Sequence, residues 1–341
     1  MPSARRWARA RGDGPVNVDL IQSVLLAFAV VVILMPAYIR FLNHLGMGKK
    51  IQEELPDTHQ AKAGVPTMGG LLLIGVIVAL FFFESGFLLP PGGIIAPLAT
   101  LLLVGGLGAF DDYLNAKTGE GISARQKMLW LVVVAVFAAY QIQDTYAIDR
   151  IAVPFVGFVF IDRWLYILFA AFAIIAAANG VNLTDGLDGL AGGTLVFAFV
   201  AFLLVALLNE QPNLAVLCAL VVGALVGFLW FNVHPAQVIM GDSGSLAFGA
   251  TLAVTALITG QILILPIIGL VFVVETLSVM IQVGYFKSTH GRRIFRMSPL
   301  HLHYQLVGWD EEKITLRFWI IGIIAGLIGV TLFLASIDKL Q

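Results

Sequence analysis

The sequence predicts an all-α protein that crosses a membrane several times. Of its 341 residues, 59% are hydrophobic and 12% are charged, whereas a typical soluble domain is about half apolar and about one quarter charged. The mean hydropathy is +0.94, and the charged residues are clustered between long apolar runs. A helix needs roughly 20 apolar residues to cross a bilayer. These observations exclude an ordinary soluble domain and predict a polytopic membrane protein.

The apolar runs divide the chain into about ten predicted membrane helices. Polar or glycine- and proline-rich segments separate the runs and mark where each helix starts and ends. The predicted helices cover residues 18–42, 68–84, 94–110, 127–143, 164–179, 192–208, 213–231, 245–260, 262–286 and 316–337. No tandem repeat or second domain is visible in the sequence. Residues 18–341 are therefore expected to form a single transmembrane domain.

Two segments fall outside this pattern. Residues 1–17 contain four arginines and are expected to be a flexible basic tail. The apolar run after the tail is too long for the central region of a cleaved signal peptide and lacks a small-residue cleavage site. Residues 148–162 are too short to span a membrane and are interrupted by Pro154 and Gly157. Their alternating pattern predicts a small β-hairpin between the fourth and fifth helices.

The distribution of basic residues predicts the orientation of the chain. The loops after the first, third, fifth, seventh and ninth helices lie on one side of the membrane, and most of the 20 lysines and arginines belong to these loops and their helix ends. The positive-inside rule places these loops in the cytoplasm and the hairpin in the periplasm. The arginines of the tail argue the other way, but the summed bias is larger. The six histidines also fall on the cytoplasmic side.

The segment from Asn179 to Gly193 is the most informative polar stretch. It reads NGVNLTDGLDGLAGG and separates two long apolar runs. Carboxylates inside or at the edge of a membrane are costly and usually mark function. Asn182, Asp185 and Asp188 recur every three residues, so a helical turn would put them on one face. We interpret the segment as part of a functional site, and the alternative is a polar loop with glycines for tight turns.

Further acidic residues adjoin other apolar runs. Asp111 and Asp112 are predicted to end the third helix, where mutual repulsion and the helix dipole disfavour them unless a cation offsets their charge. Lys127 follows at the start of the fourth helix. Asp242 lies between glycines just before the eighth helix, where it is a candidate Mg²⁺ ligand. The alternatives are a pair of solvated loop aspartates and an ordinary helix N-cap.

Two basic loops complete the set of polar features. In the first, Lys62 and Thr67 lie among glycines before the second helix, which suits either phosphate binding by the backbone or a flexible helix start. The last loop, residues 287–305, contains His301 and His303, which are candidates for ligands, phosphate donors or acid–base groups. Its arginines are equally suited to anionic lipid head groups.

Together these residues indicate Mg²⁺-assisted handling of a diphosphate, with one substrate embedded in the membrane. Gln282, on the ninth helix, is close enough to the membrane edge to line the site, and the deeper Glu275 has no assigned role. Cys218, the only cysteine, lies in an apolar run, so disulfides and thiolate metal sites are excluded. A transporter would place its polar groups near the bilayer midplane, whereas here they gather at one face. This layout favours an enzyme without a nucleic-acid partner.

From about residue 18 to its end, the chain resembles the bacterial phospho-N-acetylmuramoyl-pentapeptide transferases, within the polyprenyl-phosphate sugar-1-phosphate transferase superfamily. The resemblance rests on residues 62–70, 111–112, 179–193, 231–245 and 292–309. The last of these reads RRIFRMSPLHLHYQLVGW and separates this branch from relatives that use N-acetylhexosamine donors. A sister enzyme that uses UDP-GlcNAc is the nearest alternative.

The resemblance implies transfer of phospho-MurNAc-pentapeptide from UDP-MurNAc-pentapeptide to undecaprenyl phosphate, giving lipid I and UMP, at the cytoplasmic face of the bacterial inner membrane. Membrane lipids are implied partners, and a homodimer is a possible assembly. Mg²⁺ is the implied cofactor and Asp242 its ligand. The implied catalytic residues are Asp111, Asp112, Asp242 and His301. The implied substrate-binding residues are Lys62, Thr67, Lys127, Asn182, Asp185, Asn232, Gln282 and His303, with Gly186, Leu187 and Asp188 around the uracil.

Two residues depart from the family pattern. The family usually has three consecutive histidines, and Leu302 replaces the middle one. Ile239 stands where an aromatic residue is common, three positions before the metal aspartate. The role of Asp111 stays open between a base, a positioning group and a covalent nucleophile. A phosphate monoester has a second pKa of about 6 and is mostly dianionic at pH 7, so a base would gain little.

Overall fold

The computed structural model describes residues 16–48, 64–86, 94–154 and 156–337. In this part of the chain, ten main helices follow the ten predicted runs in order. They are α2 (Val16–His44), α4 (Gly69–Glu84), α5 (Ile95–Thr118), α6 (Ala124–Tyr146), α7 (Arg163–Thr184), α8 (Leu190–Leu208), α9 (Pro212–Asn232), α10 (Asp242–Ile258), α12 (Leu270–Ser288) and α14 (Glu311–Ile337). Eight of these described helices are long and apolar enough to cross a membrane, and α4 and α10 are shorter apolar helices. The predicted all-α, multi-pass membrane fold is confirmed.

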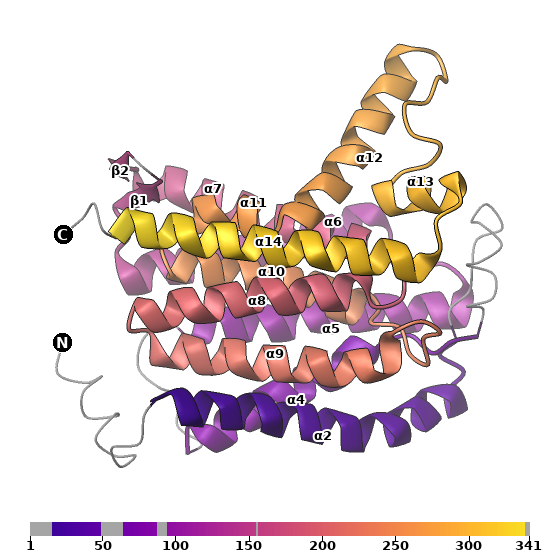
Figure 1. The fold of residues 1–341 in the computed structure, drawn as a ribbon, viewed down its shortest axis with the longest axis horizontal. Coiled ribbons are helices and arrows are strands. Elements are labelled where there is room, and N and C mark those ends of the chain that lie inside the picture. Colours follow the sequence, from indigo (N-terminus) through magenta and orange to yellow (C-terminus); the bar gives the residue numbers. More distant parts are fainter. Residues whose placement is uncertain (1–15, 49–63, 87–93, 155, 338–341) are drawn as a thin grey trace.

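The helices lie side by side, and α10 runs through the middle of the bundle (Figure 1). It packs against α5 and α7, and all its residues from Ser243 to Ile258 are buried. Its approach to α7 depends on Gly249, because a Cβ there would collide with the backbone of Ala177 and Ala178. Small residues of this kind let membrane helices gain van der Waals contact along their backbones.

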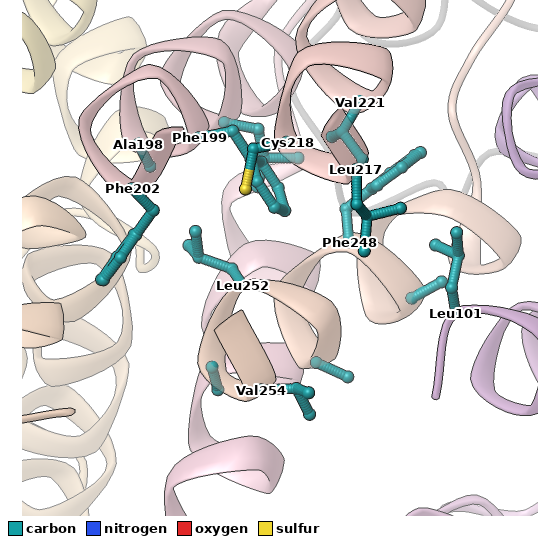
Figure 2. Packing of buried hydrophobic residues seen from close by; sticks show 14 of the residues in the cluster. Leu101, Ala198, Phe199, Phe202, Leu217, Cys218, Val221, Phe248, Leu252 and Val254 are labelled. Carbon is teal, nitrogen blue, oxygen red and sulfur yellow. The ribbon is translucent and has the colours of Figure 1, made fainter. Parts of the chain in front are cut away.

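An apolar core joins α8, α9 and α10 (Figure 2). Phe199, Cys218 and Phe248 point into it from these three helices, and none of them is exposed to solvent. The sulfur of Cys218 packs among hydrocarbon side chains, so it serves as a small apolar group. This core fixes the position of α10, whose first residue is Asp242.

The run predicted as one helix over residues 262–286 is broken, which corrects the sequence prediction. A 3₁₀ turn, η1 (Ile262–Ile264), and a short helix, α11 (Leu265–Ile268), precede α12. Proline lacks an N–H group and is tolerated in the first turn of a helix, and the proline at residue 266 starts α11 in this way. Beyond the break, α12 tilts away from the other helices (Figure 1).

The third membrane helix is longer than predicted, which moves two acidic residues into its interior. The apolar run ends at residue 110, but α5 continues to Thr118 and ends at Gly119, which adopts a left-handed backbone with φ of 87°. Asp111 and Asp112 are therefore inside the helix, not at its C-terminus. The end of the apolar run does not coincide with the end of the helix. The helix ends at Gly119, because glycine readily adopts the left-handed backbone that closes a helix.

The predicted hairpin is confirmed. Strands β1 (Arg150–Val153) and β2 (Gly157–Phe160) pair antiparallel, with Arg150 opposite Phe160. The hairpin lies at the same end of the bundle as the start of α2 and the end of α14 (Figure 1). Of the predicted tail at residues 1–17, residues 1–15 lie outside the described part of the chain, and α2 already begins at Val16.

We predict that Gly223→Ala destabilises the contact between α2 and α9. A Cβ at Gly223 would collide with the Val24 carbonyl oxygen of α2, and overpacking of this kind typically costs about 1–3 kcal/mol. Gly106→Ala is the matched control, because no atom lies within 4 Å of its Cβ position. Thermal unfolding of the purified protein in detergent measures both variants. Equal melting temperatures for the two variants would contradict this account of the packing.

Candidate active site

Asp111 and Asp242 share one ammonium group. Lys127, in the first turn of α6, places its Nζ 2.7 Å from Asp111 Oδ2 and 2.5 Å from Asp242 Oδ2. Helices α5 and α10 approach closely here because a Cβ at Gly108 would collide with the backbone of Asp242. Three residues that are far apart in the sequence therefore form one charge cluster, in which partial burial reduces the screening by salt.

Asp112 binds the N-terminus of α10. Its two carboxylate oxygens accept hydrogen bonds of 3.0 Å from the backbone N–H groups of Asp242 and Ser243. These N–H groups have no partner within their own helix, and the positive end of the helix dipole favours an anion. Gly241 has φ of 75°, and a Cβ there would collide with the Asp112 carboxylate and the Thr67 hydroxyl. Asp112 therefore sets the position of Asp242, and glycine is required beside it.

Asp111 also holds the loop between α5 and α6. Its Oδ1 accepts a 2.6 Å hydrogen bond from the Ile122 N–H, while its Oδ2 faces Lys127. A Cβ at Gly121 would collide with the same carboxylate. Both oxygens of Asp111 are thus engaged, one by the loop and one by the ammonium group.

Asn182 completes the surroundings of the Asp242 carboxylate. Its side-chain amide, in the last turn of α7, donates to Asp242 Oδ1 at 2.8 Å and to Ser245 Oγ at 2.9 Å. The carboxylates face a cavity of about 220 Å³. The residues that line the cavity are Gly48, Thr67, Asp112, Asn115, Ala116, Asn182, Asp185, Ile239, Gly241 and Asp242. Seven of the residues predicted for the site therefore lie in or beside one cleft: Thr67, Asp111, Asp112, Lys127, Asn182, Asp185 and Asp242.

The glycines at the start of α4 make backbone contacts within the protein and not the phosphate contact suggested by their sequence. The N–H groups of Gly69 and Gly70 donate to the carbonyls of Ile239 and Met240, both at 2.9 Å. A Cβ at Gly70 would collide with the backbone of Gly244. These glycines therefore join the start of α4 to the start of α10, and their N–H groups are occupied. Lys62 lies outside the described residues.

The segment from Asn179 to Gly193 is mostly helical, and its turn covers only residues 185–189. Asn182 is in α7 and Gly193 is in α8, so the three-residue spacing does not continue to Asp188. The Asp188 carboxylate is buried and is not among the residues that line the cavity. Its Oδ2 lies 2.9 Å from His234 Nδ1 and 3.1 Å from the Ala236 N–H.

Asn232 links the same turn to α9. Its Oδ1 accepts a hydrogen bond from the Gly189 N–H at 3.1 Å, and its Nδ2 donates to the Val238 carbonyl at 2.8 Å. Asn232 thus connects the turn after α7 with the segment that leads into α10. Leu187, one residue before Asp188, is buried and packs into a small apolar cluster with Ile314 and Phe318 of α14.

His301 pairs with Glu275, the residue to which the sequence assigned no role. His301 lies in the short helix α13 (Leu300–Val307), and its Nδ1 is 3.1 Å from Glu275 Oε2 of α12. The backbone N–H of His301 also donates to Glu275 Oε1 at 3.2 Å. The other ring nitrogen, Nε2, faces Gly186, where a Cβ would collide with it. A fully buried carboxylate therefore fixes the orientation of the imidazole towards the 185–189 turn.

Gln282 and His303 shape the basic loop rather than the cavity lining. Gln282 Oε1 accepts hydrogen bonds from the N–H groups of Ile294 and Phe295 at 3.1 and 3.0 Å. His303 Nδ1 accepts one from the Arg296 N–H at 3.1 Å. Both side chains hold the segment between α12 and α13, so their predicted contact with substrate remains a prediction.

The oxygen donors around Asp242 fit a magnesium ion. Among the described residues, the Asp111 and Asp242 carboxylates share the single ammonium group of Lys127, and the Asp112 carboxylate binds the backbone N–H groups of Asp242 and Ser243. Mg²⁺ is held by one or two carboxylates together with substrate phosphates and water. A second group, Asp188, His234 and Glu311, brings its ligand atoms within 4.8 Å of one another, but an imidazole donor is less suited to Mg²⁺ than oxygen.

Glu275 and Glu311 contact predicted site residues, but the sequence analysis assigned neither of them to the site. Glu275 was visible as a charge inside an apolar run, which is a signal of function in a membrane helix. Glu311 carried a weaker signal, because acidic residues are common in the first turn of a helix. Its Oε1 accepts a 2.6 Å hydrogen bond from the Asp188 N–H, 123 positions away in the sequence.

The described residues form a bundle of apolar helices with a cleft lined by carboxylates. Residues 94–260 match the family model of glycosyl transferase family 4, which places the chain among the membrane transferases. The phospho-N-acetylmuramoyl-pentapeptide-transferase of Geobacillus thermodenitrificans is 41% identical over 314 residues, covering 91% of this chain and 97% of the relative. The protein of the same name from Desulfotalea psychrophila is 42% identical, covering 92% of this chain and 92% of the relative. The one from Bacillus subtilis is also 42% identical, covering 91% of this chain and 97% of the relative. The chain belongs to the phospho-N-acetylmuramoyl-pentapeptide-transferase family.

We predict that Lys127→Gln makes the stability of the protein more dependent on divalent cations. The variant loses the ammonium group between Asp111 and Asp242, and the loss of one partner from a buried pair costs about 3–5 kcal/mol, less where the pair is partly exposed as here. Added Mg²⁺ should therefore raise the melting temperature of Lys127→Gln more than that of the unmodified protein. Arg125→Gln, an exposed change on the same helix, is the control. An equal response of all three proteins would exclude a charge-balancing role for Lys127.

Proposed function

We propose that this protein transfers phospho-MurNAc-pentapeptide from UDP-MurNAc-pentapeptide to undecaprenyl phosphate, releasing UMP and forming lipid I in the first membrane step of peptidoglycan synthesis. Relatives that carry the transferase name match nine-tenths of the chain. The structural observation that supports the proposal is the pairing of Asp111 and Asp242 with Lys127 at one cleft, where Asp112 binds the N-terminus of α10.

The reaction exchanges one phosphoric anhydride for another. A phosphate oxygen of undecaprenyl phosphate attacks the β-phosphorus of the donor, a new P–O bond forms, and the bond to the UMP oxygen breaks with its electron pair. Such a reaction needs mainly positioning and neutralisation of charge. The cleft supplies a fixed cation, Lys127, and a set of hydrogen-bonding groups, including Thr67 and Asn182.

A divalent metal fits the family and the donor set. We propose Mg²⁺, with Asp242 as its protein ligand, because Asn182 and Lys127 already hold that carboxylate in place at the cavity wall. When bound, Mg²⁺ would neutralise charge on the diphosphate of the donor. Asp112 acts through the backbone of α10, because its hydrogen bonds fix the N–H groups of Asp242 and Ser243.

The remaining assignments are proposals for substrate contact. Asp185 and Thr67 line the cavity beside the carboxylates, and His301 faces the 185–189 turn at Gly186. We assign the uracil to Gly186, Leu187 and Asp188 and the diphosphate to the Asp242 side of the cleft. The other proposed substrate contacts are Lys62, Lys127, Asn232, Gln282 and His303.

The distribution of basic residues supports an active site at the cytoplasmic face of the inner membrane. In the structure, the cleft lies at the end of the bundle opposite the β-hairpin (Figure 1). A site at that surface reaches a soluble nucleotide donor from the water and a lipid acceptor from the bilayer.

The proposal predicts Mg²⁺-dependent release of UMP by the purified protein when undecaprenyl phosphate and UDP-MurNAc-pentapeptide are both present. UMP is measured by chromatography, with UDP-GlcNAc as the competing donor. Asp242→Asn should lower the rate at least about a hundredfold, as removal of a key charge-stabilising group does in other enzymes. Turnover of UDP-GlcNAc alone would move the protein to the sister branch, and no release from either donor would remove the proposed reaction.

We further predict that Asp111→Asn loses activity at every pH. The two oxygens of Asp111 already hold the Ile122 N–H and Lys127, which favours a positioning role. If Asp111 were a base for the lipid phosphate, alkaline solution would supply the deprotonated acceptor and restore the rate. The pH dependence of UMP release between about pH 6 and 10 decides between these roles, and recovery at high pH would favour the base.

A further inference from the structure

We propose that α14 positions the nucleotide-binding turn of the active site through three side chains, Glu311, Thr315 and Trp319, which we call the α14 clamp. The inference rests on the proposed function, because it concerns the part of the cleft assigned to the donor nucleotide. The clamp residues are positioning residues, since they contact the 185–189 turn and not the reacting atoms.

The three side chains bind consecutive backbone groups of the turn. Glu311 Oε1 accepts from the Asp188 N–H at 2.6 Å, Thr315 Oγ1 donates to the Asp188 carbonyl at 3.2 Å, and Trp319 Nε1 donates to the Gly189 carbonyl at 3.1 Å. Residues spaced by four lie on one face of a helix. One face of α14 therefore satisfies both backbone groups of Asp188 and the carbonyl of Gly189.

The turn needs this support most at Asp188, because no backbone partner lies within reach of either backbone group of that residue in the described part of the chain, whereas the Gly189 carbonyl also accepts from the Gly193 N–H at 2.9 Å. Gly189 has φ of 73° and begins α8, so the backbone reverses sharply between two helices. Buried backbone groups without partners cost free energy, and both Asp188 and Gly189 are buried. The clamp and Asn232 supply partners from outside the turn.

The glycine-rich sequence of the segment supports the same conclusion. Gly193 lies inside α8, where no unusual backbone angle requires glycine, but a Cβ there would collide with the Trp319 indole. The indole also packs edge-on against Phe197, with ring centroids 6.1 Å apart. Gly193 thus makes room for the ring that reaches the Gly189 carbonyl.

The turn connects the clamp to the chemistry of the cleft. Asp185, at one end of the turn, lines the same cavity as Asp242. Gly186 lies against the His301 imidazole. A shift of the turn would therefore move a wall of the cavity and the contact with His301 together.

Apolar packing holds α14 in place independently of the clamp hydrogen bonds. Ile314 and Phe318, on the neighbouring face, pack with Leu187 and Leu190. Substitutions that remove a hydrogen-bonding group and leave an apolar side chain in its place should therefore loosen the turn without displacing the helix. When only a fraction of the molecules has a binding-competent site, the apparent affinity for the ligand falls in proportion to that fraction.

The test uses the full-length protein with Thr315→Val, Trp319→Phe and the double variant. Thr315→Ser keeps the hydroxyl and serves as the rescue variant. Thr331→Val is the matched control, because the Thr331 hydroxyl bonds only to the Leu327 carbonyl of its own helix among the contacts of the described residues. We expect KM for the nucleotide donor to rise about fivefold for each hydrogen bond removed, which corresponds to ~1 kcal/mol. KM for undecaprenyl phosphate should stay unchanged.

A second measurement tests the clamp without turnover. Hydrogen–deuterium exchange of a peptide that covers residues 185–193 should be faster in the double variant than in the unmodified protein and in Thr331→Val. Unchanged exchange and an unchanged donor KM in the double variant would overturn the clamp, as would equal increases in the KM values of both substrates. Absence of UMP release from the unmodified protein would count against the proposed function alone, and the exchange rates would still decide whether α14 holds the turn.

Discussion

The ammonium group of Lys127 between Asp111 and Asp242 is the interaction on which the rest of the site depends. Three helices contribute to it, and each brings a charge that would be unfavourable alone at the edge of a membrane. Asp112 adds a fourth contact by binding the N-terminus of α10. The same groups therefore hold the helices together, so the stability of the fold and the proposed binding of Mg²⁺ depend on the same contacts.

Much of the fold follows from the sequence, because a bilayer restricts a chain to a few solutions. The ten apolar runs and the hairpin at residues 148–162 both have counterparts in the structure. The errors arise where the end of an apolar run does not coincide with the end of a helix. Polar residues after Asp112 continue α5 to Thr118, and an unbroken apolar run contains the interruption before α12. Hydropathy indicates whether a segment lies in an apolar environment, whereas glycine and proline determine where its helices start and end.

The sequence predicted many of the residues that belong to the site, but it did not predict which of them contact one another. Family resemblance and charge indicated Asp111, Asp242 and Asn182, and the structure brings them together. No local pattern pairs Glu275 with His301 or Trp319 with Gly189, because these contacts join residues that are far apart in the sequence. The periodic spacing of the segment from Asn179 to Gly193 was misleading, since the helix ends before Asp185. Its glycines have several separate purposes, which a sequence alone cannot distinguish.

The short length of α10 affects how the proposed water-soluble donor and lipid acceptor would reach the same cleft. A helix of 17 residues is about 25 Å long, and the hydrocarbon core of a bilayer is about 30 Å thick. If the other end of such a helix lies at one surface of the hydrocarbon, a cleft built on its first residue, Asp242, would lie below the level of the lipid head groups on the opposite side. The isoprenoid chain of the proposed acceptor would then remain in the hydrocarbon while its phosphate enters the cleft from the side. The proposed soluble donor would have to reach deeper from the water, to a polar cleft that ends at a helix buried from Ser243 to Ile258.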